Sequence, residues 1–229
     1  MIKAVIFDKD GTLFDFRMSW GGWTRTLLAE LRSVTEGDLA GALGFDPDTL
    51  SFAPDSPVIA STSDEIAVVM LPYLRGVSFD ALMEVMSRIG TEAEMSPAVP
   101  LREVLSGLKE RGLLLGLATN DTEEPARAHL TGAGVIDLFD FVAGCDSGYG
   151  GKPAPGQLLA FAGQTGLPVA QIAMVGDSLH DLDAARRAGM KAVGVLTGPA
   201  LRETLTPHAD VVLATIAELG AWIDGLSAA

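Results

Sequence analysis

The sequence has little of what stabilises a secreted or membrane-spanning protein. It contains one cysteine, Cys145, so no disulfide bond can form within the chain. No uninterrupted apolar stretch approaches the roughly 20 residues of a membrane span. The segment that follows Met1 lacks the basic and then apolar pattern of a secretory signal. These absences predict a cytoplasmic protein with no membrane partner.

Positive charge is also scarce. The chain has 16 Lys and Arg residues against 30 Asp and Glu residues, which gives a net charge of −14. This imbalance disfavours nucleic-acid binding through a basic face. It still allows a phosphorylated small molecule as a partner, because a metal ion and one lysine can reverse the local field. With 3 histidines and 1 cysteine, the chain offers no His/Cys cluster for zinc.

The composition and the order of apolar runs predict an α/β fold. Of the 229 residues, 48% are hydrophobic and 20% are charged, as in a globular protein with a sizeable core. Alternation of strands and helices predicts a parallel sheet covered on both faces. The expected strands are Ala4–Phe7, Leu113–Ala118, Phe139–Ala143, Ile172–Val175, Ala192–Leu196 and Val211–Leu213. The expected helices are 100–111, 123–132, 154–165, 180–188 and 215–226, four of them followed by Gly112, Gly134, Gly166 and Gly189.

The region 16–95 differs from the rest, because it contains no convincing strand. Thr62 and Glu65 fit a capping box, and Ser78 fits a helix N-cap. We therefore expect an α/β core formed by 1–15 and 96–229, with an inserted helical unit at 16–95. That unit could cover the sheet edge as a lid, or merely bury its own apolar faces. Its amphipathic stretches are Trp20–Val34, Asp38–Leu43, Asp64–Leu74 and Phe79–Ile89.

Polar residues follow several of the expected strands directly. The carboxyl ends of parallel strands share one edge of a sheet, where α/β proteins place their ligands, so we expect these residues to converge on one crevice. Two carboxylates as close as Asp8 and Asp10 favour a hard cation, although a plain Asp-Gly turn would also explain them. In chain order the residues are Asp8, Asp10, Gly11, Thr119, Asn120, Lys152, Asp177, Ser178 and Asp181.

In this order the motifs resemble those of the haloacid dehalogenase superfamily, and within it the phosphoglycolate phosphatase-like branch. The resemblance covers about 1–15 and 96–215. It implies a Rossmann-like core with an inserted α-helical cap. It also implies Mg²⁺-dependent hydrolysis of a small phosphate monoester through an aspartyl-phosphate, with phosphoglycolate as one candidate substrate. The matching motifs are Asp8-Lys9-Asp10-Gly11-Thr12, Thr119-Asn120, Lys152, and Gly176-Asp177-Ser178-Leu179-His180-Asp181.

The same resemblance assigns the roles of individual residues. Asp8 is the expected nucleophile, and Asp10 the expected acid and base. Metal ligands are expected from Asp8, Asp177 and the main-chain carbonyl of Asp10. The phosphoryl oxygens are expected to meet Lys152, Thr119 and the main-chain amides near Gly11 and Asn120.

Several further residues have less specific signals. Asp181 orients Lys152 or a metal-bound water, or else caps a helix; Ser178 binds such a water or caps the same helix. Lys9 alternates away from its flanking Asp residues in an extended strand, so it receives no catalytic role. In the inserted unit, any of Arg17, Arg25, Arg32, Arg75 and Arg88 could clamp a substrate carboxylate. Arg17 and Arg25 lie nearest the first connection and are the expected binders.

The resemblance leaves some reactions open and disfavours others. Dehalogenases of this superfamily lack the second Asp of the first motif, so Asp10 argues against carbon–halogen cleavage. The phosphonate-cleaving branch uses a cap lysine, whereas 16–95 contains no lysine. Sugar phosphomutases share both Asp residues, and a non-catalytic binding module could keep the fold, so these two alternatives remain. The sequence does not predict an oligomeric state.

Overall fold

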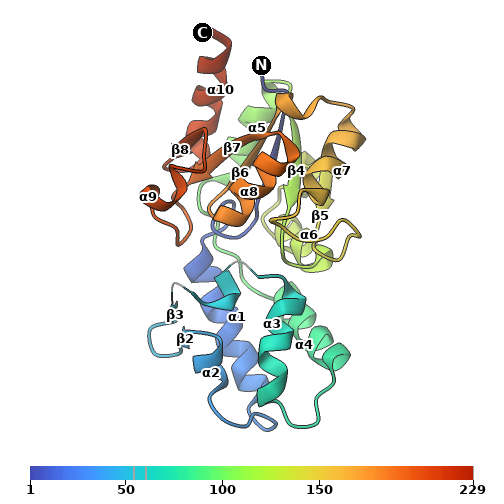
Figure 1. Cartoon of the computed structure of the whole chain (residues 1–229), viewed down its shortest axis with the longest axis vertical. Helices are drawn as coiled ribbons and strands as arrows, with labels where there is room; N and C mark the ends of the chain where they lie inside the picture. Colours follow the sequence, from blue (N-terminus) through green and yellow to red (C-terminus); the bar gives the residue numbers. More distant parts are fainter. Residues whose placement is uncertain (54, 60, 229) are drawn as a thin grey trace.

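The computed structural model describes residues 1–53, 55–59 and 61–228. Its core is a six-stranded sheet in the order β5-β4-β1-β6-β7-β8, in which every neighbouring pair is parallel (Figure 1). The six expected strands are all present, with small shifts at their ends. They are β1 Ala4–Phe7, β4 Leu114–Ala118, β5 Phe141–Ala143, β6 Ile172–Gly176, β7 Lys191–Val195 and β8 Val211–Leu213.

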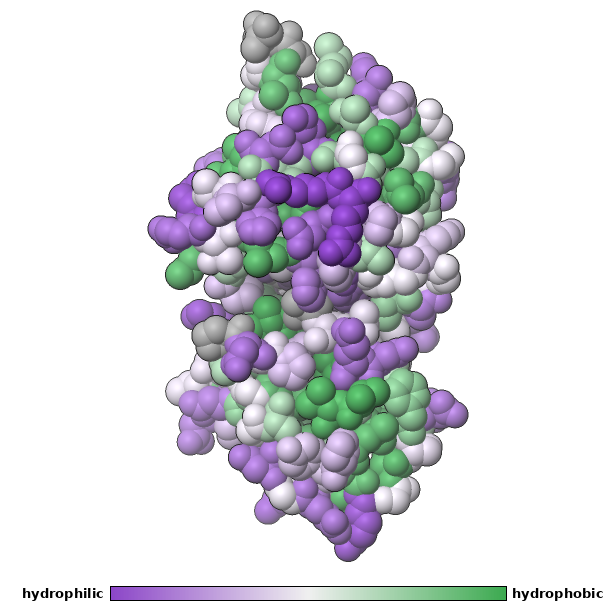
Figure 2. Space-filling model, viewed as in Figure 1, coloured by the Kyte–Doolittle hydropathy of each residue, from purple (hydrophilic) through white to green (hydrophobic). Residues whose placement is uncertain are grey.

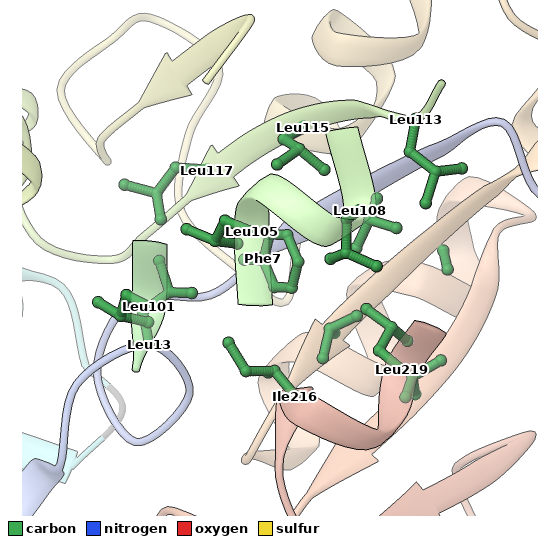
Figure 3. Close-up of a cluster of buried hydrophobic side chains, with 14 of the residues drawn as sticks. Phe7, Leu13, Leu101, Leu105, Leu108, Leu113, Leu115, Leu117, Ile216 and Leu219 are labelled. Atoms are coloured by element: carbon green, nitrogen blue, oxygen red, sulfur yellow. The ribbon is translucent and has the colours of Figure 1, made fainter. Parts of the chain in front are cut away.

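Helices cover both faces of this sheet, as predicted. Alternate residues of β1 point to opposite faces, so Val5 and Phe7 join one core cluster while Ala4 and Ile6 join the other. The first cluster, part of which is drawn in Figure 3, lies under α5 (Leu101–Glu110), α6 (Glu123–Gly132) and α10 (Leu219–Ala228). The second lies under α7 (Gly156–Thr165), α8 (Leu179–Ala188) and α9 (Arg202–Leu205).

The helix ends follow the sequence signals closely. α7 and α8 end at Gly166 and Gly189, both left-handed, with φ of 68° and 76°. The helix expected at 215–226 is instead a 3-10 turn, Ile216–Glu218, that continues into α10. Among the described residues, no helix is both long and apolar enough to cross a membrane.

A helical unit follows β1 and has an apolar core of its own. Leu27, Met70 and Leu82 are fully buried there, in a cluster separate from the two that flank the sheet. The capping box of Thr62 with Glu65 and the N-cap at Ser78 are both present. The unit consists of α1 (Phe16–Leu31), α2 (Leu39–Ala42), α3 (Ser63–Met70) and α4 (Phe79–Thr91), with 3-10 turns at Pro57–Ile59 and Leu71–Tyr73.

One expectation for this unit was wrong, because it contains a small hairpin. β2 (Phe45–Asp46) pairs antiparallel with β3 (Ser51–Phe52). Strands of two residues are too short to produce an alternating sequence pattern. The turn between them is held by the Asp46 carboxylate, which accepts hydrogen bonds from the amides of Asp48 and Thr49 at 2.9 and 3.4 Å.

Two chain segments that run side by side join the helical unit to the core. The Asp15 amide donates to the Ser96 carbonyl at 2.8 Å, and the Ala98 amide donates to the Leu13 carbonyl at 2.9 Å. The unit lies beyond the carboxyl ends of the strands, below the core in the view of Figure 1, and the space-filling view of Figure 2 shows the two parts in contact. Any ligand at the carboxyl edge of the sheet therefore also faces the helical unit.

Candidate active site

The candidate site lies where the order of strands reverses. β4 and β5 extend the sheet to one side of β1, whereas β6, β7 and β8 extend it to the other. Ligands of open parallel sheets bind beyond the carboxyl ends of the strands at such a point. Asp8 follows β1 directly, and its amide donates to the Val175 carbonyl of β6 at 2.8 Å. Asp177 follows β6, so the two carboxylates meet at this edge.

A buried lysine reaches both Asp8 and the first turn of α8. The Lys152 Nζ lies 2.5 Å from Asp8 Oδ1 and 2.6 Å from Asp181 Oδ1. Asn120 holds the loop that contains Lys152. Its side chain accepts a hydrogen bond from the Lys152 amide at 2.7 Å and donates one to the Lys152 carbonyl at 2.9 Å. Burial lowers the pKa of Lys152, but Asp181 and Asp8 outweigh that effect and raise it, so the amine stays charged.

Three buried carboxylates lie close enough to hold one metal ion. Asp8, Asp177 and Asp181 each present an oxygen within 4.8 Å of the others. Burial, Asp8 and Asp181 together raise the pKa of Asp177 well above its usual value. Lys152 alone does not balance three negative charges. A hard divalent cation with oxygen ligands fits this cluster, because it would neutralise the repulsion.

Asp10 lies apart from that cluster in a different environment. Its carboxylate lies 3.3 Å from the Lys9 Nζ and does not share the three-carboxylate group around Asp177. Burial raises the pKa of Asp10, and the neighbouring Lys9 opposes the rise. The two carboxylates of the first motif are therefore held in separate surroundings, which is how one site can contain a nucleophile and an acid.

The expectation that Lys9 points away from its flanking Asp residues was wrong. β1 ends at Phe7, so strand alternation does not reach Lys9, and its side chain is fully buried beside Asp10. Its Nζ donates to Asp121 Oδ2 at 2.7 Å and lies 2.9 Å from the Nδ1 of His129. The local sequence around Lys9 could not predict these contacts, because Asp121 and His129 are more than 100 residues away in the sequence.

His129 extends the Lys9 network into the helical unit. Its Nε2 lies 2.6 Å from the carbonyl oxygen of Gly90 in α4. A carbonyl can only accept, so Nε2 carries the proton and Nδ1 accepts from the Lys9 ammonium. Burial and Lys9 lower the pKa of His129 to about 4. A neutral imidazole thus links the core to the helical unit.

The two alternatives for Asp181 are both realised. Its Oδ1 pairs with Lys152, while its Oδ2 accepts from the Ser178 hydroxyl at 2.6 Å and from the Ser178 amide at 3.1 Å. The Ser178 hydroxyl in turn accepts from the Asp181 amide, which completes a capping box at the start of α8. Asp181 is held from both sides and holds Lys152 in place.

Glycine is required at two positions around Asp177. Gly11 has a φ of 81°, and a Cβ there would lie 2.4 Å from Asp177 Oδ2. A Cβ on Gly198 would lie 1.7 Å from the same oxygen. The neighbouring Thr197 hydroxyl donates to the Gly11 carbonyl at 2.6 Å. The loop after β7 is thus a part of the site that the sequence reasoning missed, although polar residues after a buried strand were the available signal.

Thr119 directly follows β4 at the same edge and is 1% exposed. Its hydroxyl accepts a hydrogen bond from the Asp121 amide at 3.1 Å, which leaves the hydroxyl hydrogen for a ligand. Thr119, Asn120 and Lys152 line one cavity with the acidic residues. This cavity also contains Asp8, Asp10, Asp177, Ser178 and Asp181, and it extends to the helical unit at Trp20, Trp23, Met83 and Met86.

The structure does not bring Arg17 and Arg25 to this cavity. Both are exposed on α1 and line a separate hollow with Glu92 and Glu94. The sequence placed them near the first connection, but a helix turns about 100° per residue, so proximity in sequence does not fix the face. Trp20 and Trp23 occupy the face of α1 that lines the cavity.

Known proteins resemble this chain along most of its length. The family model for haloacid dehalogenase-like hydrolases matches residues 2–189. The phosphoglycolate phosphatase of Rhodospirillum rubrum is 33% identical over 97% of this chain and 91% of its own length. A Dickeya dadantii protein named "Probable phosphatase IndB" is 37% identical over 86% of this chain and 83% of its own length.

Solved structures share the fold at lower sequence identity. The crystal structure of a predicted phosphoglycolate phosphatase from Haemophilus somnus superposes with a TM-score of 0.75, covering 97% of this chain and 98% of that one at 21% identity. The match to the family model spans most of the chain, including every residue of the carboxylate and lysine cluster. The chain therefore belongs to the haloacid dehalogenase-like hydrolase family.

Proposed function

We propose that this hydrolase is a Mg²⁺-dependent phosphatase that cleaves a small phosphate monoester through a phosphorylated Asp8. The observation that carries the proposal is the buried pairing of Asp8 with Lys152 beside Asp177 and Asp181. A phosphate monoester repels nucleophiles, so its hydrolysis needs charge neutralisation, an in-line nucleophile and a proton for the leaving oxygen. The names of the two curated relatives support phosphatase activity.

Asp8 is the proposed nucleophile. Burial raises the pKa of Asp8 to about 7, and Lys152 opposes that rise, so the carboxylate form depends on its ion pair. An Asp8 oxygen attacks phosphorus while the bond from phosphorus to the ester oxygen breaks. Lys152 and the Thr119 hydroxyl hold phosphoryl oxygens during the step. Bound Mg²⁺, held by Asp8, Asp177 and the Asp10 carbonyl, would supply further positive charge to those oxygens, while Asp181 stays paired with Lys152 beside the ion.

Asp10 is the proposed proton carrier. Burial favours its protonated form, which gives its proton to the leaving oxygen of the first step. The resulting carboxylate then takes a proton from water as the water oxygen attacks phosphorus. The bond from Asp8 to phosphorus breaks, inorganic phosphate leaves, and both carboxyl groups return to their starting forms. The helical unit, acting as a lid, would keep other water away from this intermediate.

Phosphate release from a panel of esters tests the proposal. The panel contains phosphoglycolate, sugar phosphates and nucleotides, each with Mg²⁺ and with EDTA. We expect release that EDTA abolishes. No release from any ester would contradict phosphatase activity. An assay for sugar-phosphate isomerisation would then separate a mutase from a binding module.

A further inference from the structure

The two sides of the active-site cavity differ in charge. The core side supplies five carboxylates, namely Asp8, Asp10, Asp121, Asp177 and Asp181. The helical unit supplies only uncharged side chains among its described lining residues, mainly aromatic, aliphatic and hydroxyl groups. The phosphate end of a substrate belongs at Lys152, so its leaving group must point toward the helical unit.

No arginine of the helical unit is available to that leaving group. Arg17 and Arg25 line the other hollow, which among the described residues shares only Trp23 with the active-site cavity. Arg75 is exposed and pairs with Glu36, and Arg88 is exposed and pairs with Glu30. Arg32 is exposed at the end of α1 and does not line the cavity. The unit also contains no lysine.

The cations of the core side are already engaged. Lys152 pairs with Asp8 and Asp181, and Lys9 lies behind the lining in contact with Asp10 and Asp121. His180 is the remaining lining group that can carry positive charge, and it lies on the core side at the start of α8. A second anionic group that points toward the helical unit would therefore face apolar surface, and the core side has no excess positive charge to attract it, because Lys152, Lys9 and the proposed Mg²⁺ are already balanced by its carboxyl groups. Desolvating it there is costly.

The helical unit instead offers a surface for an apolar or aromatic group. The rings of Trp20 and Trp23 pack edge to face with centroids 4.8 Å apart. Met83 and Met86 lie in the same lining, and thioether side chains adapt to flat ring faces. The Trp23 indole is 4% exposed and its Nε1 has no hydrogen-bond partner among the described residues. A ligand oxygen that reaches this buried N–H would give it the partner it lacks.

We propose that the physiological leaving group is an uncharged alcohol with an apolar or aromatic face, and not a hydroxy acid such as glycolate. The inference rests on the proposed phosphatase function and concerns the same site. It follows the chemistry of the lining, in which hydroxyls, an indole N–H and apolar surface recognise neutral groups. The paired charge-assisted hydrogen bonds by which an arginine recognises a carboxylate are missing from this lining, because no arginine or lysine is among the described lining residues of the helical unit.

Matched pairs of esters test this directly. Benzyl phosphate is compared with 4-carboxybenzyl phosphate, and 2-hydroxyethyl phosphate with phosphoglycolate, so that each pair differs mainly in one carboxylate. We expect kcat/KM to be higher for the uncharged member of each pair by about tenfold or more. Equal values, or a preference for the carboxylates, would overturn the inference.

Variants of the lining give a second measurement. Met83→Arg adds a cation to the cavity and should raise the ratio of phosphoglycolate to 2-hydroxyethyl phosphate turnover by about tenfold, whereas Met83→Gln should not. Arg17→Ala should leave that ratio unchanged, and a selective loss of phosphoglycolate turnover would overturn the inference.

Release from no ester would contradict the proposed function itself. Preferred release from phosphoglycolate would contradict only the substrate class.

Discussion

At the scale of single residues, the site separates two carboxylates that are neighbours in sequence. Asp8 lies against Lys152, and Asp10 lies against Lys9. Each carboxylate therefore has its own buried cation. Lys9 also neutralises Asp121, so one ammonium serves two carboxylates inside the protein. Removing one partner of a buried ion pair is expensive, because the remaining charge stays buried.

We predict that Lys9→Met lowers the free energy of unfolding by about 3 kcal/mol or more. Methionine keeps most of the volume and removes the charge, so Asp10 and Asp121 lose their counter-ion. The matched control is Lys191→Met, whose exposed pair with Asp210 should be worth about 1 kcal/mol at most. Urea unfolding of the wild type and the two variants measures the loss in free energy of unfolding for each substitution. Equal effects of the two substitutions would contradict the importance of burial.

The lowered pKa of His129 predicts that the stability of the protein depends on pH. The pKa of His129 is about 4 in the folded protein, against the usual 6.5 in an unfolded chain. Between these values the unfolded chain binds a proton that the folded protein does not, so stability falls as the pH falls from 6.5 to 4. The loss amounts to about 3 kcal/mol and is absent above pH 6.5.

The His129→Gln variant tests this pH dependence. Glutamine cannot take up the proton. The free energy of unfolding of the variant should therefore fall less steeply than that of the wild type as the pH falls from 6.5 to 4. Urea midpoints at several pH values in that window supply the comparison. Parallel curves for the two proteins would show that His129 does not titrate in this way.

At the scale of elements, each functional group is placed by the end of a strand or the start of a helix. β1 positions Asp8, β6 positions Asp177, and the capping box of α8 positions Asp181. The loop after β7 completes the site through Gly198, which leaves space for the Asp177 carboxylate. An added methyl group at Gly198 must move that carboxylate or the loop.

We predict that Gly198→Ala lowers kcat/KM by about tenfold or more and weakens stabilisation by Mg²⁺, because a Cβ would overlap Asp177 Oδ2. Gly225→Ala in α10 is the control, since nothing lies within 4 Å of its added Cβ. That substitution should leave activity unchanged. Phosphate-release kinetics and thermal melts with and without Mg²⁺ compare the two variants. Full activity of Gly198→Ala would contradict the tight packing around Asp177.

The elements that the sequence predicted correctly are those with strong local signals. Ala4–Phe7 and Val211–Leu213 read as strands because they are short apolar runs with clear ends, and Thr62 with Glu65 marked the start of α3. The errors arose where long-range contacts decide the outcome. Lys9 was judged by strand alternation, but contacts with distant residues determine where its side chain lies.

The substrate-facing part of the site was the least predictable from sequence. The core motifs occur at strand ends, so topology alone brings Asp8, Thr119 and Asp177 together. No comparable rule orients side chains on the helices of the inserted unit. Arg17 and Trp20 are three residues apart on α1 and line different hollows, which only the packing of α1 determines.

At the scale of the whole molecule, the helical unit and the core form one cavity between them. The paired segments Leu13–Asp15 and 96–98 connect the two lobes, and the contact of His129 with Gly90 fixes α4 against α6. The carboxylates at the base of the cavity repel one another in the absence of a cation. Function therefore costs some stability at this point of the molecule.

We predict that Mg²⁺ raises the midpoint of thermal unfolding of the wild type, because only the folded protein assembles the three carboxylates. Asp177→Asn should remove most of that increase. In EDTA the same variant should be more stable than the wild type by roughly 1 kcal/mol or more, since one buried charge is gone. Calorimetry in both conditions tests this. An equal response to Mg²⁺ in both proteins would argue against Asp177 as a metal ligand.

The role of Asp8 is tested most directly by comparing phosphate release by the wild type and by Asp8→Asn, on whichever ester the wild type cleaves best. Asparagine keeps the size of the side chain and removes its nucleophilic carboxylate. We predict a fall in kcat of about a thousandfold or more, with circular dichroism unchanged. Release by the Asn variant at the wild-type rate would contradict a mechanism that proceeds through phosphorylated Asp8.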